Sequence, residues 1–413
     1  MANPKISSKI LFVTSYYPSE CKDILNRKSG NRLQAASNLF QESVIDGLNA
    51  NRVDYDIVCL PALPTWPRYS DFYTPHGEIR ISGLKRGRYL SYCTLPIYKQ
   101  ISQRIVLRRY MREWCKVNAI NNNVYVLVYT QQSEFLGVAI DLKKKYPDLV
   151  VSTIITDLIE HAMEFASNRG LLKRIQVRIE AWAERRILPK VDKYILLTGQ
   201  MADILSAAVG KFTVMEGIAP NIKHNCVESK KSISKDTRTL LYAGTFQEFG
   251  GLRMLVDAFR KTTDERFRLV LCGAGVLSNY VQQAAKEDRR IIYKGLVSHK
   301  EVLNLQQMST LLINPRRPNG GITKYSFPSK TMEYLSSYTP MIGYRLEGIP
   351  TEYYQYIFTP NDLSKEALTQ CINETLSLPF EQLSQRAQEA YDFVSLNKNS
   401  KVQISKLLDF IME

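Results

Sequence analysis

The chain has 413 residues, 45% of them hydrophobic, and a formal net charge of +15. This length predicts two domains, each able to bury a core of its own. No apolar run approaches the roughly 18 residues of a transmembrane helix, and the N-terminus lacks the apolar segment of a secretory signal. Seven scattered cysteines without paired spacing favour reduced thiols over disulfides or a zinc site.

The first half of the chain alternates predicted strands with predicted helices. Residues 9–18 form an apolar run that ends at a proline, as is typical of a buried strand. Residues 62–95 are rich in Pro, Tyr and Arg, and we expect a long irregular segment there. Further strands are predicted at 55–61, 124–129, 149–156 and 193–198, and helices at 34–48, 97–118, 134–145 and 171–188.

Positive charge is concentrated in this half. Residues 1–238 carry 35 Lys and Arg against 22 Asp and Glu, whereas residues 239–413 carry 20 against 18. The patch at 80–116 includes Arg104, Arg108 and Arg112 on the amphipathic pattern of the predicted helix, which favours an anionic membrane surface as partner. A solvated basic face without a partner is the alternative. No nucleic acid partner is expected, because no nucleic-acid-binding motif accompanies the patch.

The second half repeats the pattern after a polar stretch at 220–238, which we interpret as a linker. Strands alternating with helices predict an α/β fold with parallel sheets. We expect two Rossmann-like domains facing across a cleft, residues 1–220 and 221–389, with a C-terminal helix at about 390–413 that packs back on the first domain. The predicted strands are 239–243, 268–272, 290–293, 311–314 and 340–344, and the helices 251–262, 277–286, 300–308, 365–376 and 380–413.

Residues 325–340 carry the most informative motif. Pro328 suits the first turn of a helix, with Ser326 or Phe327 as its N-cap. The free N–H groups of such a helix start, together with Lys330, favour phosphate binding. Glu333 lies one turn further, where its carboxylate could accept hydrogen bonds from sugar hydroxyls. These residues predict a nucleoside-diphosphate site.

Two further segments support this site. Residues 244–251 place glycines between a strand and a helix, where backbone can approach a ligand closely. Arg316 and Arg317 follow a predicted strand, and guanidinium groups suit diphosphate oxygens. Gly273 begins a Gly-Ala-Gly turn that lacks the remaining features of a dinucleotide fingerprint.

One acidic motif is interpreted as structural. Asp54 and Asp56 match the Asp-x-Asp pattern of metal-dependent sugar-nucleotide enzymes. They sit at the start of a strand, where alternate side chains share a face, and we expect this face to be solvated. No metal site is predicted.

Taken together, these segments resemble the family-4 glycosyltransferases, retaining enzymes of the GT-B fold, and in particular members that build bacterial surface polysaccharides. The resemblance is sharpest across 240–259 and 314–342. It implies donor-binding roles for the glycine turns, the two arginines and the motif at 325–333. The donor-site residues are Gly244, Thr245, Gly273, Arg316, Arg317, Tyr325, Ser326, Phe327, Ser329, Lys330 and Glu333.

The chain departs from the family pattern at several positions. The family's paired glutamates would fall at 325 and 333, yet position 325 is Tyr. Its phosphate-binding Arg and Lys would fall near Thr245 and Gly250, and both are missing. Lys330 is therefore the predicted principal cation, and Asp157, at the end of a first-domain strand, is a second candidate catalytic residue.

The resemblance implies transfer of a sugar from a nucleoside-diphosphate donor to a glycan acceptor, with a lipid-linked acceptor fitting the basic patch. It implies no cofactor and no metal. We expect a cytoplasmic protein, peripheral on the inner face of the cell membrane. The alternatives are a sugar-nucleotide epimerase or hydrolase of the same fold, and a non-catalytic partner subunit.

Overall fold

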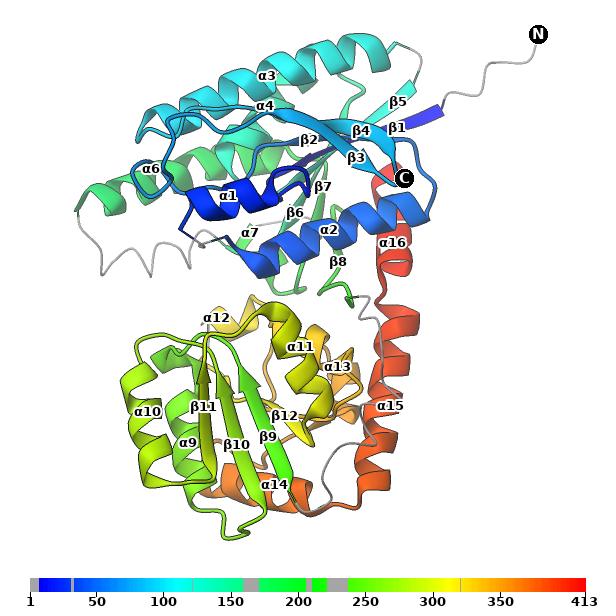
Figure 1. Ribbon diagram of the computed structural model, residues 1–413. Helices are drawn as coiled ribbons and strands as arrows, with labels where there is room; N and C mark the ends of the chain where they lie inside the picture. Colours follow the sequence, from blue (N-terminus) through cyan, green and yellow to red (C-terminus); the bar gives the residue numbers. More distant parts are fainter. Residues whose placement is uncertain are drawn as a thin grey trace. The chain divides into compact units, whose positions relative to one another are not determined.

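A computed structural model describes residues 7–30, 33–120, 122–158, 171–205, 210–220, 237–319 and 321–413. The chain forms two compact units (Figure 1): unit 1 comprises Met1–Ile218 and Ser400–Glu413, and unit 2 comprises Ala219–Asn399. Each unit is built on its own sheet. Most of the predicted linker at 220–238 lies outside the described residues.

Unit 1 contains an eight-stranded sheet in the order β3-β4-β2-β1-β5-β6-β7-β8. Its central strand is almost fully apolar, since Ile10, Leu11, Phe12 and Val13 are all buried, as expected for a parallel strand covered on both faces. The chain order reverses between β1 and β5. The strands are β1 (Ser7–Thr14), β2 (Tyr55–Cys59), β3 (Gly77–Ile81), β4 (Leu84–Tyr89), β5 (Asn122–Tyr129), β6 (Val150–Ile155), β7 (Lys193–Leu196) and β8 (Phe212–Val214).

The hairpin of β3 and β4 corrects the expectation that 62–95 is irregular throughout. β3 pairs antiparallel with β4, which in turn pairs parallel with β2. The hairpin lies at the sheet edge and many of its residues are exposed, so its sequence is too polar to read as a strand. Gly87 permits the pairing, because a Cβ there would overlap with the backbone of Ile57.

Helices cover both faces of this sheet (Figure 1). The C-terminal α16 packs against α2, while α4 packs against both α3 and α6 on the other side. The bounds are α1 (Lys22–Lys28), α2 (Ala35–Ala50), α3 (Tyr98–Asn118), α4 (Ser133–Lys143), α6 (Leu171–Ile187), α7 (Met201–Leu205) and α16 (Ser400–Met412).

Unit 2 contains a six-stranded parallel sheet in the order β11-β10-β9-β12-β13-β14. Its order reverses between β9 and β12. The strands are β9 (Arg238–Ala243), β10 (Phe267–Cys272), β11 (Ile291–Gly295), β12 (Leu311–Asn314), β13 (Met341–Gly343) and β14 (Ile357–Phe358). The helices are α9 (Leu252–Arg260), α10 (Ser278–Glu287), α11 (His299–Met308), α12 (Gly321–Lys324), α13 (Ser329–Leu335), α14 (Lys365–Ser377) and α15 (Phe380–Asn397).

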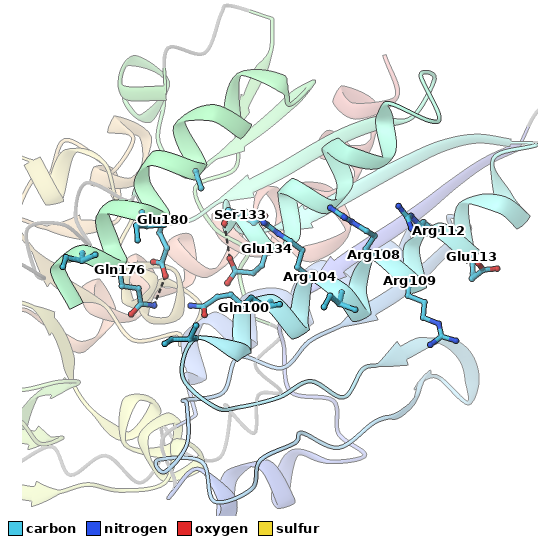
Figure 2. A pocket seen from close by; sticks show the side chains of 16 residues that line it. Gln100, Arg104, Arg108, Arg109, Arg112, Glu113, Ser133, Glu134, Gln176 and Glu180 are labelled. Atoms are coloured by element: carbon cyan, nitrogen blue, oxygen red, sulfur yellow. Dashed lines mark hydrogen bonds between the residues drawn. The ribbon is translucent and has the colours of Figure 1, made fainter. Parts of the chain in front are cut away.

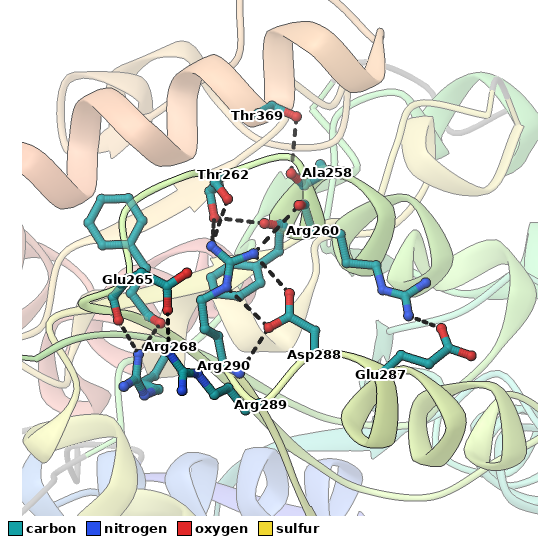
Figure 3. A network of polar contacts seen from close by, with 12 residues as sticks. Ala258, Arg260, Thr262, Glu265, Arg268, Glu287, Asp288, Arg289, Arg290 and Thr369 are labelled. Carbon is teal, nitrogen blue, oxygen red and sulfur yellow. Dashed lines mark hydrogen bonds and ion pairs between the residues drawn. The ribbon is translucent and has the colours of Figure 1, made fainter.

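A polar network closes the end of this sheet where β10 and β11 begin (Figure 3). The buried guanidinium of Arg290 donates to Asp288 at 3.1 and 2.8 Å and to the carbonyl of Thr262 at 2.6 Å. Thr262 directly follows α9 and its C-cap, so one side chain ties the helix end to the start of β11. The network lies at the amino-terminal ends of β10 and β11. The loops that follow these strands lie at their carboxyl ends.

The predicted closing helix at 380–413 is interrupted. It is split into α15 and α16 at Lys398 and Asn399. The carbonyl of Lys398 accepts a hydrogen bond from the backbone N–H of Ala219 at 2.7 Å, and its ammonium pairs with Glu352 at 2.9 Å. These contacts hold the break within unit 2, and the chain then returns to unit 1.

Candidate active-site residues in the two units

The candidate donor site lies where the strand order of unit 2 reverses, the position at which open α/β sheets bind ligands. Gly244 follows β9, and Gly273 follows β10 with φ 140°. A Cβ on Gly273 would overlap with the carbonyl oxygen of Gly244, and a Cβ on Gly244 would overlap with Nζ of Lys330. Both positions therefore need glycine to bring backbone and lysine together.

Lys330 occupies the centre of this region. Its Nζ lies 4.7 Å from the ring centroid of Tyr242, over the ring face. Burial lowers the pKa of the Lys330 ammonium to about 8, with Glu333 opposing the shift and Arg316 adding to it. The lysine is thus a cation held by an aromatic face and a nearby carboxylate at the carboxyl end of β9.

Helix α13 is anchored so that Lys330 reaches this position. The fully buried Tyr334 lies one turn further along the helix, and its hydroxyl contacts the backbone N–H and carbonyl of Ala243, both at 3.4 Å. Because Ala243 ends β9, the tyrosine fixes the helix against the strand that precedes Gly244.

The N-cap prediction for this helix is wrong. Pro328 occupies the N-cap position, and no side chain caps the helix start. Ser326 instead donates its hydroxyl to the carbonyl of Ile322 at 2.6 Å and accepts from Arg316 at 3.3 Å. A short helix before Pro328, α12, provides that carbonyl and thus draws the serine away.

The side chains of the two predicted arginines lie in different places. Arg316 contacts Ser326 and acts electrostatically on Lys330. Arg317 lines a different groove of about 600 Å³, together with Gly251 and Asp257 of the α9 region. Of the two arginines, only Arg316 is brought near the lysine.

Glu333 is positioned by a residue that sequence analysis missed. The buried Gln306, on α11, donates Nε2 to Glu333 Oε1 at 2.5 Å. Tyr242 was missed as well, since a tyrosine inside a strand is normally a core residue. Nothing in the sequence around Gln306 distinguishes it from other helix glutamines.

The remaining predicted donor-site residues lie around this centre. The carbonyl of Thr245 accepts from the hydroxyl of Tyr242 at 3.0 Å. Phe327 is buried against Tyr353, with ring centroids 5.4 Å apart, and is therefore a packing residue. Tyr325 lies under the ammonium of Lys324, 5.3 Å from its ring centroid, and Ser329 is exposed at the first position of α13.

A polar pocket of about 590 Å³ lies at the corresponding edge of unit 1. It is formed where the loops after β1, β5 and β6 meet, beside the reversal of strand order. Asp157, which follows β6, is exposed there and accepts from Thr156 at 3.5 Å. The other polar lining residues include Ser15, Gln34, Ser37, Lys99, Gln100, Gln103, Thr130, Gln132, Glu134, Gln176 and Glu180.

Asp54 and Asp56 have structural contacts. Lys9 Nζ lies 2.6 Å from Asp54 and 3.3 Å from Asp56, and Trp114 Nε1 donates to Asp56 at 2.8 Å. The pair thus fastens α3 to β1 and β2. Over the described part of the chain, no group of three His, Cys, Asp or Glu residues is arranged to hold a metal ion.

The predicted surface arginines lie along α3. Arg104 donates to the carbonyl of Ser133 at 3.1 Å, and Arg108 pairs with Asp141 of α4 at 2.5 Å. Arg112, one turn further, is exposed. Two of the three arginines therefore also fasten α3 to α4. Among the described residues, no helix is both long and apolar enough to cross a membrane.

Comparison with known proteins agrees with this geometry. Residues 237–377 match the family model described as "Glycosyl transferases group 1". This segment includes Gly244, Gly273, Lys330 and Glu333. No curated protein sequence matches the chain.

Solved structures match over nearly the whole length. The chain is similar to the apo form of the lipopolysaccharide outer core galactosyltransferase WaaB, with TM-score 0.62 and 13% identity over 98% of this chain and 99% of that one. It is similar to Anabaena Alr3699/HepE in complex with UDP, with TM-score 0.59 and 11% identity over 98% and 99%. It is also similar to the catalytic domain of Arabidopsis thaliana starch synthase IV bound to ADP and acarbose, with TM-score 0.64 and 9% identity over 99% of both chains.

At these identities the structural similarities show the fold. The prediction of a GT-B fold built from two Rossmann-like α/β units is confirmed. The chain has the fold of the GT-B glycosyltransferases, and the group 1 glycosyltransferase model matches it within unit 2.

Proposed function

We propose that this protein is a retaining glycosyltransferase that transfers a sugar from a nucleoside-diphosphate donor to a hydroxyl of a glycan acceptor. The observation that carries the proposal is the position of Lys330, against Gly244 and beside Glu333, at the strand reversal of the unit that matches the glycosyltransferase model. In this proposal unit 2 binds the donor and unit 1 binds the acceptor.

The leaving diphosphate develops negative charge as the bond to the sugar breaks. A buried ammonium stabilises such charge more strongly than an exposed one, because water screens it less. Lys330 would supply the stabilising positive charge, with support from Arg316. The Glu333 carboxylate, oriented by Gln306, would accept hydrogen bonds from the ribose hydroxyls. On this basis we propose that transfer does not require a metal ion.

Asp157 would orient the acceptor hydroxyl. It lies in the polar pocket of unit 1, whose amide, hydroxyl and carboxylate groups are suited to hydrogen bonding with a sugar. One structural neighbour is a lipopolysaccharide outer core galactosyltransferase, which is compatible with an acceptor of a surface polysaccharide pathway. We further propose that the protein works in the cytoplasm, peripheral on the inner membrane surface.

A donor-binding assay tests the proposal. Thermal shift with UDP, ADP and GDP, and with their sugar conjugates, should reveal one preferred base, since a ligand at about 100 times its Kd adds roughly 2.7 kcal/mol to stability. Lys330→Met and Glu333→Gln should abolish the shift, while Lys286→Met, at an exposed lysine of the same unit, should retain it. Unchanged binding in the first two variants would refute this donor site.

Product analysis distinguishes the alternatives. A transferase forms glycoside only when acceptor is supplied, and the anomeric configuration of the donor is kept in the product. Sugar release or isomerisation that is indifferent to acceptor would indicate a hydrolase or an epimerase. Activity that survives chelation of divalent ions by EDTA would support the metal-independent mechanism, whereas its loss and recovery with added Mg²⁺ would contradict it.

A further inference from the structure

An apolar groove in unit 1 opens beside the polar pocket. It has a volume of about 940 Å³, with α3 and α6 as its walls and the first turn of α4, Ser133 and Glu134, between them (Figure 2). Apolar residues dominate the surface of its lining, although it lies on the outside of the unit. This feature is not explained by the core of the fold, and neither the donor site nor the strand reversal uses it.

Isoleucines line both walls at helical spacing. On α3 and its N-cap the lining residues Ile97, Ile101 and Ile105 recur every four positions and are 79, 53 and 62% exposed. On α6, Ile175 and Ile179 are 46 and 61% exposed. Residues four apart share one face of a helix, so two apolar stripes line one groove. Exposed apolar surface of this kind marks a binding site for an apolar group.

The groove and the polar pocket adjoin each other. Four residues line both of them, Gln100 of α3, Glu134 of α4, and Gln176 and Glu180 of α6. Figure 2 shows Glu134 between the two walls, and Gln176 donates to Glu180 at 2.9 Å. A ligand could therefore place one end among polar groups near Asp157 and the other end among the isoleucines.

The α3 side of the groove is basic. Arg104, Arg108, Arg109 and Arg112 line it, with Glu113 on the same helix (Figure 2). The other two carboxylates of the lining, Glu134 and Glu180, lie where the groove adjoins the polar pocket. The positive charge of the arginines disfavours a cationic ligand and suits an anionic group lying along α3.

We propose that the acceptor is an anionic amphiphile whose aliphatic tail lies in the α3–α6 groove and whose hydroxyl-rich head enters the polar pocket at Asp157. The inference rests on the proposed function, because it names the chemical class of the acceptor. A single bound lipid molecule fits the concave shape better than a flat bilayer surface does. Hydroxyl groups of the head suit the shared carboxylates and amides, and burial of the tail removes the exposed isoleucines from water.

Equilibrium binding of matched glucosides tests the tail site. Octyl glucoside, kept below its critical micelle concentration, should bind roughly tenfold or more tightly than methyl glucoside, because each buried methylene contributes to affinity. The double variant Ile105→Gln with Ile179→Gln should lose this advantage. Val117→Gln, at a 75% exposed position on the same helix that does not line the groove, should keep it.

Equal affinity for the two glucosides would overturn the proposal, as would an octyl advantage that survives in the double variant. A photoreactive group in the octyl tail gives a second measurement that does not depend on recognition of glucose. Crosslinks should map to peptides of α3 and α6, and crosslinks confined to other segments would overturn the proposal.

Two further experiments test the charge of the ligand and whether the tail belongs to a single molecule or to a bilayer. Monomeric dodecyl phosphate should displace bound octyl glucoside more strongly than dodecyltrimethylammonium does. The opposite order would overturn the proposal that the ligand is anionic. Binding to vesicles of phosphatidylcholine and phosphatidylglycerol without any binding of monomeric amphiphile would overturn the proposal of a tail-binding groove. The isoleucines would then be assigned to contact with a bilayer. Failure of the donor site is detected separately, because nucleotide binding by thermal shift does not involve these probes.

Discussion

Lys330 is half-buried, so its ammonium loses part of the solvation that water would otherwise provide. Desolvation of an ammonium destabilises the folded state unless a partner compensates. The ring of Tyr242 and the carboxylate of Glu333 compensate only in part, since the pKa still falls to about 8. Because desolvation of its ammonium destabilises the folded state, we expect Lys330 to serve ligand binding.

The first prediction concerns the pH dependence of nucleotide binding. Lys330 loses its proton as pH rises through its pKa of about 8, so affinity for UDP or ADP should be highest below this pH and fall above it. A bound diphosphate stabilises the charged form and raises its pKa, so the fall starts near the pKa of the free protein and continues up to the higher pKa of the complex. Calorimetric titration over a pH range from about 6.5 to about 9.5, on either side of the pKa, measures the change in affinity.

Lys330→Met provides the matched comparison. Its residual affinity should be low and flat across the same range, and its melting temperature near neutral pH should rise, because no charge has to be buried. A wild-type affinity that does not change between these pH values would contradict the role of the lysine.

The second prediction separates the two glycines. Gly273→Ala places a Cβ against the carbonyl of Gly244 at φ 140°, where backbone has to shift; we expect a loss of about 2 kcal/mol or more in unfolding free energy. Gly244→Ala meets the flexible end of Lys330 and, at 3.2 Å, the hydroxyl of Tyr242, but no backbone. It should cost less stability but weaken nucleotide binding. Chemical denaturation and titration of both variants check this, and an equal loss of stability would contradict it.

A local sequence motif predicted the two charged residues of the candidate site, but not the residues that contact them. Lys330 and Glu333 lie in a local motif, so their proximity follows from one helical turn. Tyr242 and Gln306 reach them from other elements, β9 and α11, across distances in sequence that no local pattern encodes. Arg317 lies next to Arg316 in the chain, yet it lines another groove.

At the scale of elements, helix α3 both packs and presents charge. Its buried residues, such as Leu107 and Met111, face the sheet, while arginines follow the outer side. Arg108 forms an ion pair with α4. The helix can therefore carry surface charge without losing its attachment.

The third prediction concerns this surface. Replacing Arg104, Arg108 and Arg112 by Glu reverses three charges and should weaken binding to vesicles that contain phosphatidylglycerol, by roughly 1 kcal/mol for each charge near the surface. Vesicle sedimentation at low and high salt measures this. Conversion of Lys365, Lys294 and Lys286 of unit 2 to Glu is the control, and equal loss in both triple variants would indicate net charge alone.

The fourth prediction concerns the network that ends α9. Arg290→Met leaves the Thr262 carbonyl without its donor and leaves Asp288 with only the backbone N–H of residue 290, at 2.9 Å, and should cost about 2–3 kcal/mol in unfolding free energy. Arg289→Met, whose side chain is 86% exposed, should change stability by less than about 0.5 kcal/mol. Urea denaturation measures both.

The contribution of this network to the free energy of unfolding should fall at low pH. Its hydrogen bonds to Arg290 hold the pKa of the Asp288 carboxyl below its usual value. The stabilisation is therefore present above the unfolded pKa of about 3.9 and is lost as pH falls through the lower folded pKa. A stability difference between wild type and Arg290→Met that persists undiminished in strong acid would contradict this assignment.

At the scale of the whole molecule, the C-terminal segment of the chain completes unit 1. The chain leaves unit 1, forms all of unit 2, and returns with α16 to pack on α2. Asn51 donates to the carbonyl of Lys401 at 2.9 Å, and Ile404 lies directly over Gly47. The last residues of the sequence therefore belong to the core of unit 1.

The fifth prediction follows from this return. Gly47→Val would overlap with Ile404 and with the backbone of Ser400; we expect a loss of about 1–3 kcal/mol from unit 1. Hydrogen exchange should become faster in residues 400–412, while unit 2 keeps its protection. Ala36→Val, at an exposed position on α2, controls for helix propensity, and faster exchange in both variants would contradict the packing argument.

The sequence by itself determined most of the strands, the parallel α/β class and the proximity of Lys330 to Glu333. Each depends on local information, namely an apolar run, a helical period or a motif within one turn. The edge hairpin β3–β4, the break between α15 and α16, the supports of Lys330 and the isoleucine groove were decided only by tertiary structure. Their residues become partners through packing between distant segments, because burial and strand pairing, not local propensity, select those contacts.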